Sequence, residues 1–254
     1  MKPSLFLACA AVLVTVVGSS AQQADAASTT PAKTAHSKSK AHDWTLVVSS
    51  TPKGGFVMGN PNAKVKLVEY GSMTCPHCAH FDETAVPKLI GNYVKTGQVS
   101  WEFRNYVRDA TDVTASLVAR CSGTKAFFPV TRALFKDQPR WEEKIGHAPE
   151  DELNKINDLP LGEKFLAVAK LVGFQQWAAA HGVPVKKSTQ CLTNEDSIQQ
   201  LVQMTGDATT DFPDFRGTPS FVINGGLVDL GPVTEDEVWP TLESKIKSAL
   251  GEQG

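Results

Sequence analysis

The chain has 254 residues, which is enough for one large or two small domains with a buried core. Its 25 basic and 27 acidic side chains give a formal net charge of −2 and are mixed along the sequence. We therefore expect it to bind neither nucleic acid nor an anionic membrane surface.

The first 21 residues have the pattern of a secretory signal peptide. A basic residue precedes an apolar run over residues 5–17, and small residues then lead to Ala21, where a signal peptidase would cleave. Cleavage after Ala26 fits the pattern as well. The run is shorter than the about 20 apolar residues that a membrane span needs. Cys9 lies inside the run and leaves a lipoprotein anchor open as an alternative. We expect export to the periplasm.

Residues 22–43 are mostly small, polar or basic and show no apolar periodicity. Such a segment cannot bury enough surface to offset the entropy of ordering the chain, so we predict a disordered linker. His36 and His42 lie in it and are interpreted as solvated linker residues, with metal capture as the alternative.

The folded part is expected to begin with a short strand over residues 44–48, followed by turns within 54–62. A buried strand over 65–70 comes next, then a helix from Pro76 that ends at Gly97, and an alternating strand over 99–106. Strand, helix and strand in this order predict a βαβ unit with two parallel strands.

Residues 112–210 contain several expected helices and no expected strand. We predict that they form a helical domain inserted into the first domain. Its expected helices cover residues 113–121, 125–136, 150–157, 162–181 and 196–205, separated by proline and glycine.

After the helical region, two short strands over 220–224 and 227–230 are expected to meet at Gly225-Gly226 in a tight hairpin. A closing helix runs from Thr234 to Leu250, with acidic residues in its first turn and lysines near its end, as the helix dipole favours. Residues 44–111 and 211–254 would then form one domain, interrupted by the helical domain 112–210.

Cys75 and Cys78 are spaced to close a small ring, which is the pattern of a redox dithiol. Pro76 suits the first turn of a helix, so Cys75 falls at a helix N-terminus, where unpaired N–H groups and the helix dipole lower the pKa of a thiol. We predict that Cys75 is the nucleophile and Cys78 the resolving thiol. A structural disulfide and half of a metal site are the alternatives. The metal site lacks partners, because the chain has no second Cys-x-x-Cys and no His-x-x-x-His spacing.

The Cys75-Pro76-His77-Cys78 motif and the later Gly217-Thr218-Pro219-Ser220-Phe221 resemble the DsbA-type thiol oxidoreductases of the thioredoxin superfamily. The similarity covers roughly residues 44–250 and is most specific at these two motifs. It implies an α/β fold, namely a thioredoxin fold with an inserted helical domain.

The resemblance also implies roles for single residues. Pro219 should follow a cis peptide bond beside the dithiol, where the backbone of Thr218 could pair with a substrate strand. Pro76 is a second candidate for substrate binding. His77 should donate to the Cys75 thiolate, which would make the disulfide more oxidising, unless it is merely a polar turn residue. The threonine before the proline is similar to the disulfide isomerases rather than to the strongest oxidants.

Glu69 lies six residues before Cys75, inside an otherwise apolar strand, so burial should raise its pKa. Thioredoxin-like proteins carry an acid at this offset, and the resemblance implies that Glu69 moves the proton of the resolving thiol. The alternative is a glutamate that points out of an edge strand.

Removal of the signal peptide leaves four cysteines, and an even number suits an oxidising compartment. With Cys75 and Cys78 paired by proximity, Cys121 and Cys191 could form a second disulfide that closes a loop of about 70 residues, or remain as two buried thiols. Some DsbA-like proteins carry such a pair, so the resemblance favours a structural disulfide.

The sequence therefore predicts an exported monomeric enzyme, without cofactor or bound metal, that introduces disulfide bonds into reduced client proteins. By resemblance, a DsbB-like membrane protein would reoxidise it. A disulfide isomerase or reductase is the alternative enzyme. An alternative that is not an enzyme is a periplasmic carrier that binds copper or zinc through Cys75, Cys78, His77 and His80.

Overall fold

The structure is a computed structural model that describes residues 42–252. Six strands form one mixed sheet in the order β1-β2-β4-β3-β5-β6. The strands are β1 (Val48–Ser50), β2 (Phe56–Gly59), β3 (Val65–Gly71), β4 (Val99–Asn105), β5 (Ser220–Ile223) and β6 (Gly226–Leu227). The dithiol motif follows directly after β3.

The strand β3 lies at the centre of the sheet, between β4 and β5. It runs parallel to β4, with Val65 opposite Val99, and antiparallel to β5, with Tyr70 opposite Ser220. A parallel pair needs a crossover connection, which the helices after β3 supply. The predicted βαβ unit is confirmed.

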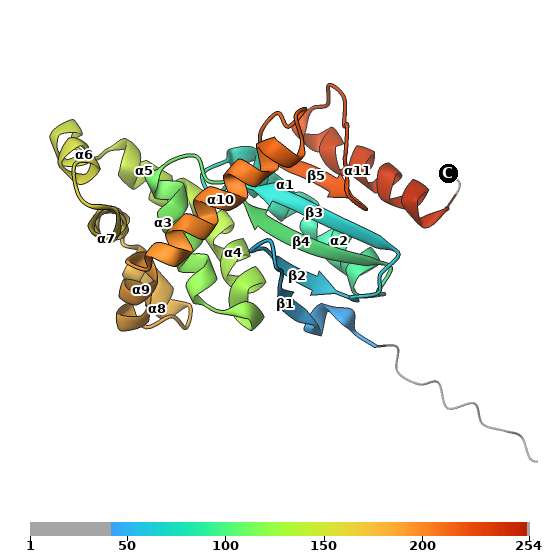
Figure 1. The fold of residues 1–254 in the computed structure, drawn as a ribbon, viewed down its shortest axis with the longest axis horizontal. Coiled ribbons are helices and arrows are strands. Elements are labelled where there is room, and N and C mark those ends of the chain that lie inside the picture. Colours follow the sequence, from blue (N-terminus) through green and yellow to red (C-terminus); the bar gives the residue numbers. More distant parts are fainter. Residues whose placement is uncertain (1–41, 253–254) are drawn as a thin grey trace, which may run out of the picture. The chain divides into compact units, whose positions relative to one another are not determined.

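Eleven α-helices are assigned in residues 42–252, and Figure 1 shows those of the middle of the chain beside the sheet. They are α1 (Pro76–Thr84), α2 (Val86–Leu89), α3 (Ala110–Cys121), α4 (Phe127–Lys136), α5 (Gln138–Gly146), α6 (Glu150–Asn157), α7 (Leu161–Val172), α8 (Phe174–Ala180), α9 (Val185–Leu192), α10 (Glu195–Asp211) and α11 (Glu235–Leu250). The helices α3 to α10 all lie between β4 and β5 in sequence.

The two faces of the sheet are covered differently because side chains alternate along each strand. Leu67 of β3 belongs to the main core, which also contains Leu89 of α2 and Leu242 of α11. On the opposite face, Tyr70 packs with Ala208 of α10 in a small second cluster. Figure 1 shows α10 crossing this second face. Cys75 and Cys78 belong to the main core and therefore lie on its side of the sheet.

Several helices differ from those expected. Residues 162–181 form two helices, because Gly173 takes a φ of 81° between α7 and α8. The helix expected from Pro76 to Gly97 is divided as well: α1 ends at Thr84, and α2 and a five-residue π-helical segment at Ile90–Val94 follow.

Two helices were missed because prolines were taken as breaks between helices. Pro139 lies in the first turn of α5, and Pro184 directly precedes α9. A proline is tolerated at the start of a helix, where its missing N–H costs no hydrogen bond.

The beginning of the folded region also departs from the expectation. Trp44–Leu46 is a 3₁₀ turn rather than part of a strand, because the side chain of Asp43 accepts a hydrogen bond from the backbone of Thr45. A strand was missed at β2, which pairs with both β1 and β4.

The hairpin between β5 and β6 is confirmed, although its turn is shifted by one residue and its second strand covers Gly226–Leu227 instead of 227–230. Asn224 and Gly225 are the turn residues, with φ values of 50° and 89°, instead of Gly225 and Gly226. Two consecutive positive φ angles are the requirement of a type I′ turn, and Asn-Gly is the sequence that satisfies it best.

The predicted signal peptide and all but the last two residues of the predicted linker lie outside the described residues. The proposed domain boundaries stay a prediction. Within residues 42–252, none of the helices is both long and apolar enough to cross a membrane.

Candidate active site

Cys75 occupies the N-cap of α1 and is only 3% exposed. Cys75 follows the end of β3 by a few residues. Pro76 then begins α1, because the fixed φ angle of proline is suited to the first turn of a helix. The sulfur of Cys75 therefore lies where the first N–H groups of α1 have no carbonyl partner in the helix.

The surroundings of Cys75 favour its thiolate and lower the pKa of the thiol from 9.0 to about 5. The hydrogen bond from the Cys78 thiol is the largest cause. Burial opposes it, whereas the side chain of Thr218 and the backbone N–H groups of Cys78 and His77 lower the pKa further. At neutral pH, Cys75 is consequently ionised when the dithiol is reduced, as the sequence predicted.

Cys78 lies in the first turn of α1 and is completely buried. Burial raises its pKa well above the usual value, and the neighbouring Cys75 sulfur acts in the same direction. Both thiols are free in the structure. The motif thus combines an activated thiolate with a buried thiol that holds its proton.

The second motif meets the dithiol because β5 pairs with β3. The register that sets Ser220 opposite Tyr70 brings Pro219 to the end of β3 at which Cys75 lies. The Thr218–Pro219 peptide bond is cis, as the resemblance predicted. The carbonyl oxygen of Thr218 lies 3.2 Å from the Cys75 sulfur.

Glu69 points from β3 into the main core and is 1% exposed. The alternative interpretation, an outward-facing glutamate on an edge strand, is wrong because β3 is a central strand. Burial is the main reason why the pKa of Glu69 rises from 4.5 to about 8. The indole N–H of Trp101 donates to its carboxyl group at 3.0 Å. Glu69 is therefore protonated at neutral pH. When ionised, it lies close enough to Cys78 to raise the pKa of that thiol.

The His77 ring does not make its expected contact with Cys75. Its Nδ1 atom contacts the carboxylate of Glu235 in the first turn of α11, and the side chain is 60% exposed. Only the backbone N–H of His77 acts on the Cys75 sulfur. His80 faces Asp236, the next residue of α11, with 3.3 Å between Nε2 and Oδ1. A carboxylate is a stronger partner for an imidazole than a buried sulfur that other donors already satisfy.

The sequence did not predict the residues that hold the loop before the dithiol. The buried Gln138 side chain donates to the carbonyl oxygens of Met73, at 2.6 Å, and Cys75, at 3.1 Å. The buried Asp112 accepts from the Ser72 hydroxyl at 2.6 Å and from the Met73 N–H at 2.9 Å. These side chains follow the dithiol by more than 30 residues, so no local pattern could have identified them.

A small cavity of about 280 Å³ opens beside the dithiol. Its lining is mostly apolar and comes from α1, from the loop with the cis proline and from the segment leading into α11: Phe81, Pro219, Leu230, Val233 and Val238, with Thr218, His77, His80, Gly231 and Glu235. An extended chain segment with a cysteine would meet both apolar and polar partners there.

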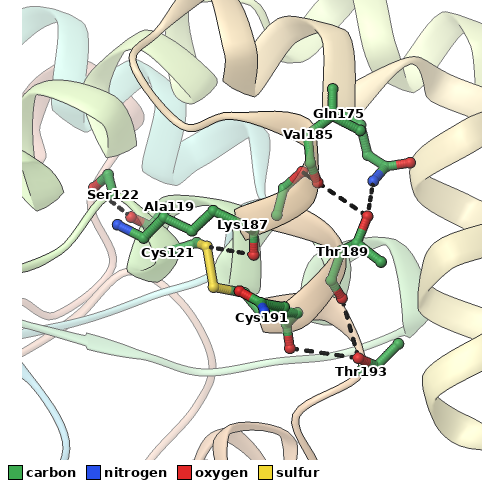
Figure 2. Close-up of a disulfide and its surroundings, with 11 residues drawn as sticks. Ala119, Cys121, Ser122, Gln175, Val185, Lys187, Thr189, Cys191 and Thr193 are labelled. Carbon is green, nitrogen blue, oxygen red and sulfur yellow. Dashed lines mark hydrogen bonds between the residues drawn. A yellow bond between two sulfur atoms is a disulfide. The ribbon is translucent and has the colours of Figure 1, made fainter.

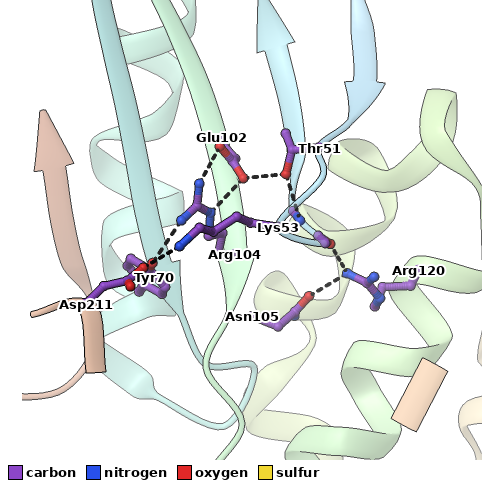
Figure 3. Close-up of polar contacts among 10 residues, drawn as sticks. Thr51, Lys53, Tyr70, Glu102, Arg104, Asn105, Arg120 and Asp211 are labelled. Atoms are coloured by element: carbon purple, nitrogen blue, oxygen red, sulfur yellow. Dashed lines mark hydrogen bonds and ion pairs between the residues drawn. The ribbon is translucent and has the colours of Figure 1, made fainter. Parts of the chain in front are cut away.

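A larger cavity of about 750 Å³ lies on the other face of the sheet and contains no thiol. Figure 3 shows polar contacts among several of its side chains, including Glu102 and Arg104. Arg104 donates to Glu102 at 2.7 Å and to the hydroxyl of Tyr70 at 2.9 Å, and Thr51 donates to Glu102 at 2.7 Å. These contacts join β3 and β4 to the turn that follows β1, which is a structural role.

Cys121 and Cys191 form a disulfide with an S–S distance of 2.01 Å, which ties the end of α3 to α9 (Figure 2). This is the pairing that the resemblance favoured. In the described part of the chain, no three His, Cys, Asp or Glu side chains gather as ligands for a metal ion.

Residues 51–243 match the protein family described as Thioredoxin. Among solved structures, a protein-disulfide isomerase of Novosphingobium aromaticivorans is 30% identical, with a TM-score of 0.69, over 75% of this chain and 96% of that one. The DsbA-type protein α-DsbA1 of Wolbachia pipientis, 20% identical with a TM-score of 0.58 over 77% of this chain and 90% of that one, shares the fold.

A provisionally named protein-disulfide oxidoreductase of Rickettsia felis is 30% identical over 199 residues, which are 78% of this chain and 61% of that protein. The chain thus spans about three fifths of the length of this curated relative. The predicted resemblance and the predicted α/β fold are confirmed. The chain belongs to the thioredoxin family.

Proposed function

We propose that this protein is an exported thiol:disulfide oxidoreductase that introduces disulfide bonds into client proteins through Cys75 and Cys78. The contrast between the two thiols carries the proposal: the pKa of Cys75 falls to about 5, whereas that of Cys78 rises well above its usual value. Stabilising one thiolate stabilises the reduced dithiol, which makes the corresponding disulfide a better oxidant.

The reaction consists of two thiol–disulfide exchanges. A client thiolate attacks the Cys75 sulfur, the Cys75–Cys78 bond breaks, and Cys78 leaves and takes up a proton. A second client thiolate then attacks the client sulfur of the mixed disulfide, and Cys75 leaves as a thiolate. The client loses two electrons, which the dithiol gains. The low pKa of Cys75 makes it a good leaving group in the second exchange.

The small apolar cavity beside the dithiol is the proposed docking place of the client. Thr218 and Pro219 form one of its walls, and the carbonyl of Thr218 already lies 3.2 Å from the Cys75 sulfur. A client strand that pairs with the backbone of Thr218 would bring its cysteine to Cys75. Pro76, the residue between Cys75 and the rest of α1, would contact the same strand.

Glu69 is proposed as the group that exchanges a proton with Cys78. It is buried, protonated at neutral pH with a pKa of about 8, and electrostatically coupled to the Cys78 thiol. A neutral carboxyl group can protonate Cys78 when this thiol leaves the disulfide, and a carboxylate can remove the proton in the reverse direction.

A disulfide isomerase is the second candidate. It is favoured by Thr218, and the structure of the Novosphingobium aromaticivorans protein, 30% identical to this chain, is that of a protein-disulfide isomerase. An isomerase needs the reduced dithiol to persist, whereas an oxidase needs the disulfide to be restored after each reaction.

As an oxidase, the protein would act as a monomer on reduced client proteins in the periplasm, and a DsbB-like membrane protein would restore its disulfide. Export is supported by the signal pattern in residues 1–21. It would also need neither cofactor nor metal, since both electrons are held by the two cysteines.

The test is to mix the oxidised protein with an equal amount of a reduced, unfolded protein that has one native disulfide. Mass spectrometry after alkylation follows transfer of the disulfide, with Cys75→Ser as the control. We expect rapid transfer from the parent protein only. The equilibrium with glutathione then separates the candidates: a potential near about −120 mV fits an oxidase, and one near about −270 mV would contradict it.

A further inference from the structure

The side chain of His77 is held by a helix that follows it by more than 150 residues. Its Nδ1 atom contacts the carboxylate of Glu235, the first residue of α11. Because a carboxylate can only accept a hydrogen bond, Nδ1 is the donor. The imidazole is 60% exposed and the carboxylate 47%, so this pair lies at the surface and can be removed without opening the core. The exchange reactions of the proposed function do not use this contact.

The contact is one of two between α1 and the start of α11. Beside it, His80 faces Asp236, with 3.3 Å between Nε2 and Oδ1. The two histidines are three positions apart on α1, so they lie on the same side of that helix. A capping box between Thr234 and Glu237 holds the start of α11 independently of either histidine. Glu235 can therefore be replaced while the start of the helix stays in place.

The imidazole of His77 has room to turn toward the dithiol. His77 follows Cys75 by two positions, and its backbone N–H already acts on the Cys75 sulfur. Its side chain lines the cavity of about 280 Å³ that Thr218 also lines, and the Thr218 carbonyl oxygen lies 3.2 Å from the same sulfur. Glu235 lines this cavity as well. A ring released from Glu235 can thus enter a space that reaches a direct neighbour of the sulfur.

The acceptor that His77 chooses affects the stability of the reduced dithiol. A thiolate accepts a hydrogen bond from an imidazole N–H, and a histidine beside a cysteine stabilises its thiolate. While Nδ1 donates to Glu235, this stabilisation of Cys75 is missing. The carboxylate also brings a negative charge to the same cavity, which disfavours a thiolate. Both effects of Glu235 act against the reduced form.

We propose that Glu235 is a positioning residue that holds the His77 imidazole away from the Cys75 sulfur and thereby limits the oxidising strength of the dithiol. The inference rests on the proposed function, because it concerns the reduced dithiol that results when a client is oxidised. It deepens that function by naming the residue that withholds an available hydrogen-bond donor from the thiolate.

Reduction of the protein by glutathione measures the oxidising strength. Two glutathione thiols give two electrons to the Cys75–Cys78 disulfide and become glutathione disulfide. One of their two protons goes to Cys78, and the other is released to solvent, because Cys75 stays a thiolate at neutral pH. A group that stabilises this thiolate therefore raises the equilibrium constant for reduction by the same factor.

The experiment determines this equilibrium constant at pH 7 for the parent, Glu235→Ala, His77→Ala and the double variant. Each protein is equilibrated with mixtures of reduced and oxidised glutathione, quenched with acid, alkylated and analysed by mass spectrometry. We expect Glu235→Ala to raise the equilibrium constant about tenfold, which corresponds to one pH unit in the pKa of Cys75. In the His77→Ala background, the same substitution should raise it only about twofold, as expected for the loss of a surface charge that acts through water.

Asp236→Asn is the matched control. It removes the next carboxylate of the same helical turn, which faces His80 and not His77. It should therefore raise the equilibrium constant by about twofold at most.

Three results would overturn the inference and leave the redox function intact. They are no rise in Glu235→Ala, an equally large rise when His77 is already alanine, and an equally large rise in Asp236→Asn. The last two would mean that Glu235 acts through its charge alone. A parent protein whose Cys75–Cys78 disulfide is not reduced at any glutathione ratio would overturn the oxidase function and the inference together.

Discussion

Glu69→Gln tests whether the carboxyl group beneath the dithiol is held in its neutral form. An unfolded chain ionises Glu69 near pH 4.5, whereas the folded protein does so near pH 8. Because the folded state binds the proton more tightly, the free energy of unfolding falls as the pH rises from 4.5 to 8 and changes no further above it. Each pH unit is worth about 1.4 kcal/mol, so the full loss is about 5 kcal/mol.

Glutamine has no charge to bury, and its amide oxygen can still accept the hydrogen bond from Trp101. We therefore expect Glu69→Gln and the parent protein to be similarly stable at acidic pH, while above pH 8 the variant gains up to about 5 kcal/mol. Urea unfolding of the oxidised proteins at several pH values measures this, since neither thiol titrates in the disulfide form. The Cys75 charge, the smallest of the causes that raise the pKa of Glu69, is absent there, so the gain stays below this upper value.

The matched control is Glu83→Gln, which removes an exposed carboxylate of the same helix and should leave the pH dependence unchanged. If the difference between Glu69→Gln and the parent does not grow with pH, Glu69 is ionised in the folded protein, and its assignment as a proton donor to Cys78 is wrong.

Three further variants test other contacts. Gln138→Ala leaves buried loop carbonyls without a donor, so it should lower the free energy of unfolding by about 1 to 3 kcal/mol in a urea titration; no change would mean that the clamp is not formed. Replacing Cys121 and Cys191 together should cost about 2 to 4 kcal/mol in the same assay while disulfide transfer persists, and finding that both cysteines can be alkylated in the parent protein unfolded without a reductant would disprove the bridge. His77→Ala should move the pKa of Cys75 by less than about one pH unit, because the imidazole contacts a carboxylate of α11 and the backbone N–H is retained. A larger rise, measured by thiolate absorbance, would show that the ring reaches the sulfur.

The sequence revealed those parts of the site whose signals are local. Cys75, Pro76 and Cys78 follow one another at a helix start, so their spacing alone predicted both the ring and the activated thiol. Pro219 lies over 140 positions away, and only its resemblance to a known motif could bring it to Cys75; the pairing of β5 with β3 is the physical cause of that contact.

Other contacts depend on packing that no local pattern encodes. Gln138, which reaches the loop before the dithiol, is the first residue of α5, and Pro139 follows it in the first turn; the sequence interpretation took this proline as a break between helices. The partner of His77 was assigned wrongly for a similar reason, since Glu235 reaches it from a helix more than 150 residues later. Glu69 was recognised because an acid in an apolar strand stands out, whereas its donor Trp101 looked like any other core residue.

The central claim is that Cys75 is a stabilised thiolate beside a protonated Cys78, and the direct measurement is the absorbance of the reduced protein near 240 nm as a function of pH, with Cys75→Ser to identify the signal. The structure predicts a midpoint near pH 5 that disappears in the variant, with no second transition below pH 9. A midpoint for Cys75 above about pH 8 would place it at the value of an ordinary thiol and contradict the assignment of this site as an oxidising dithiol.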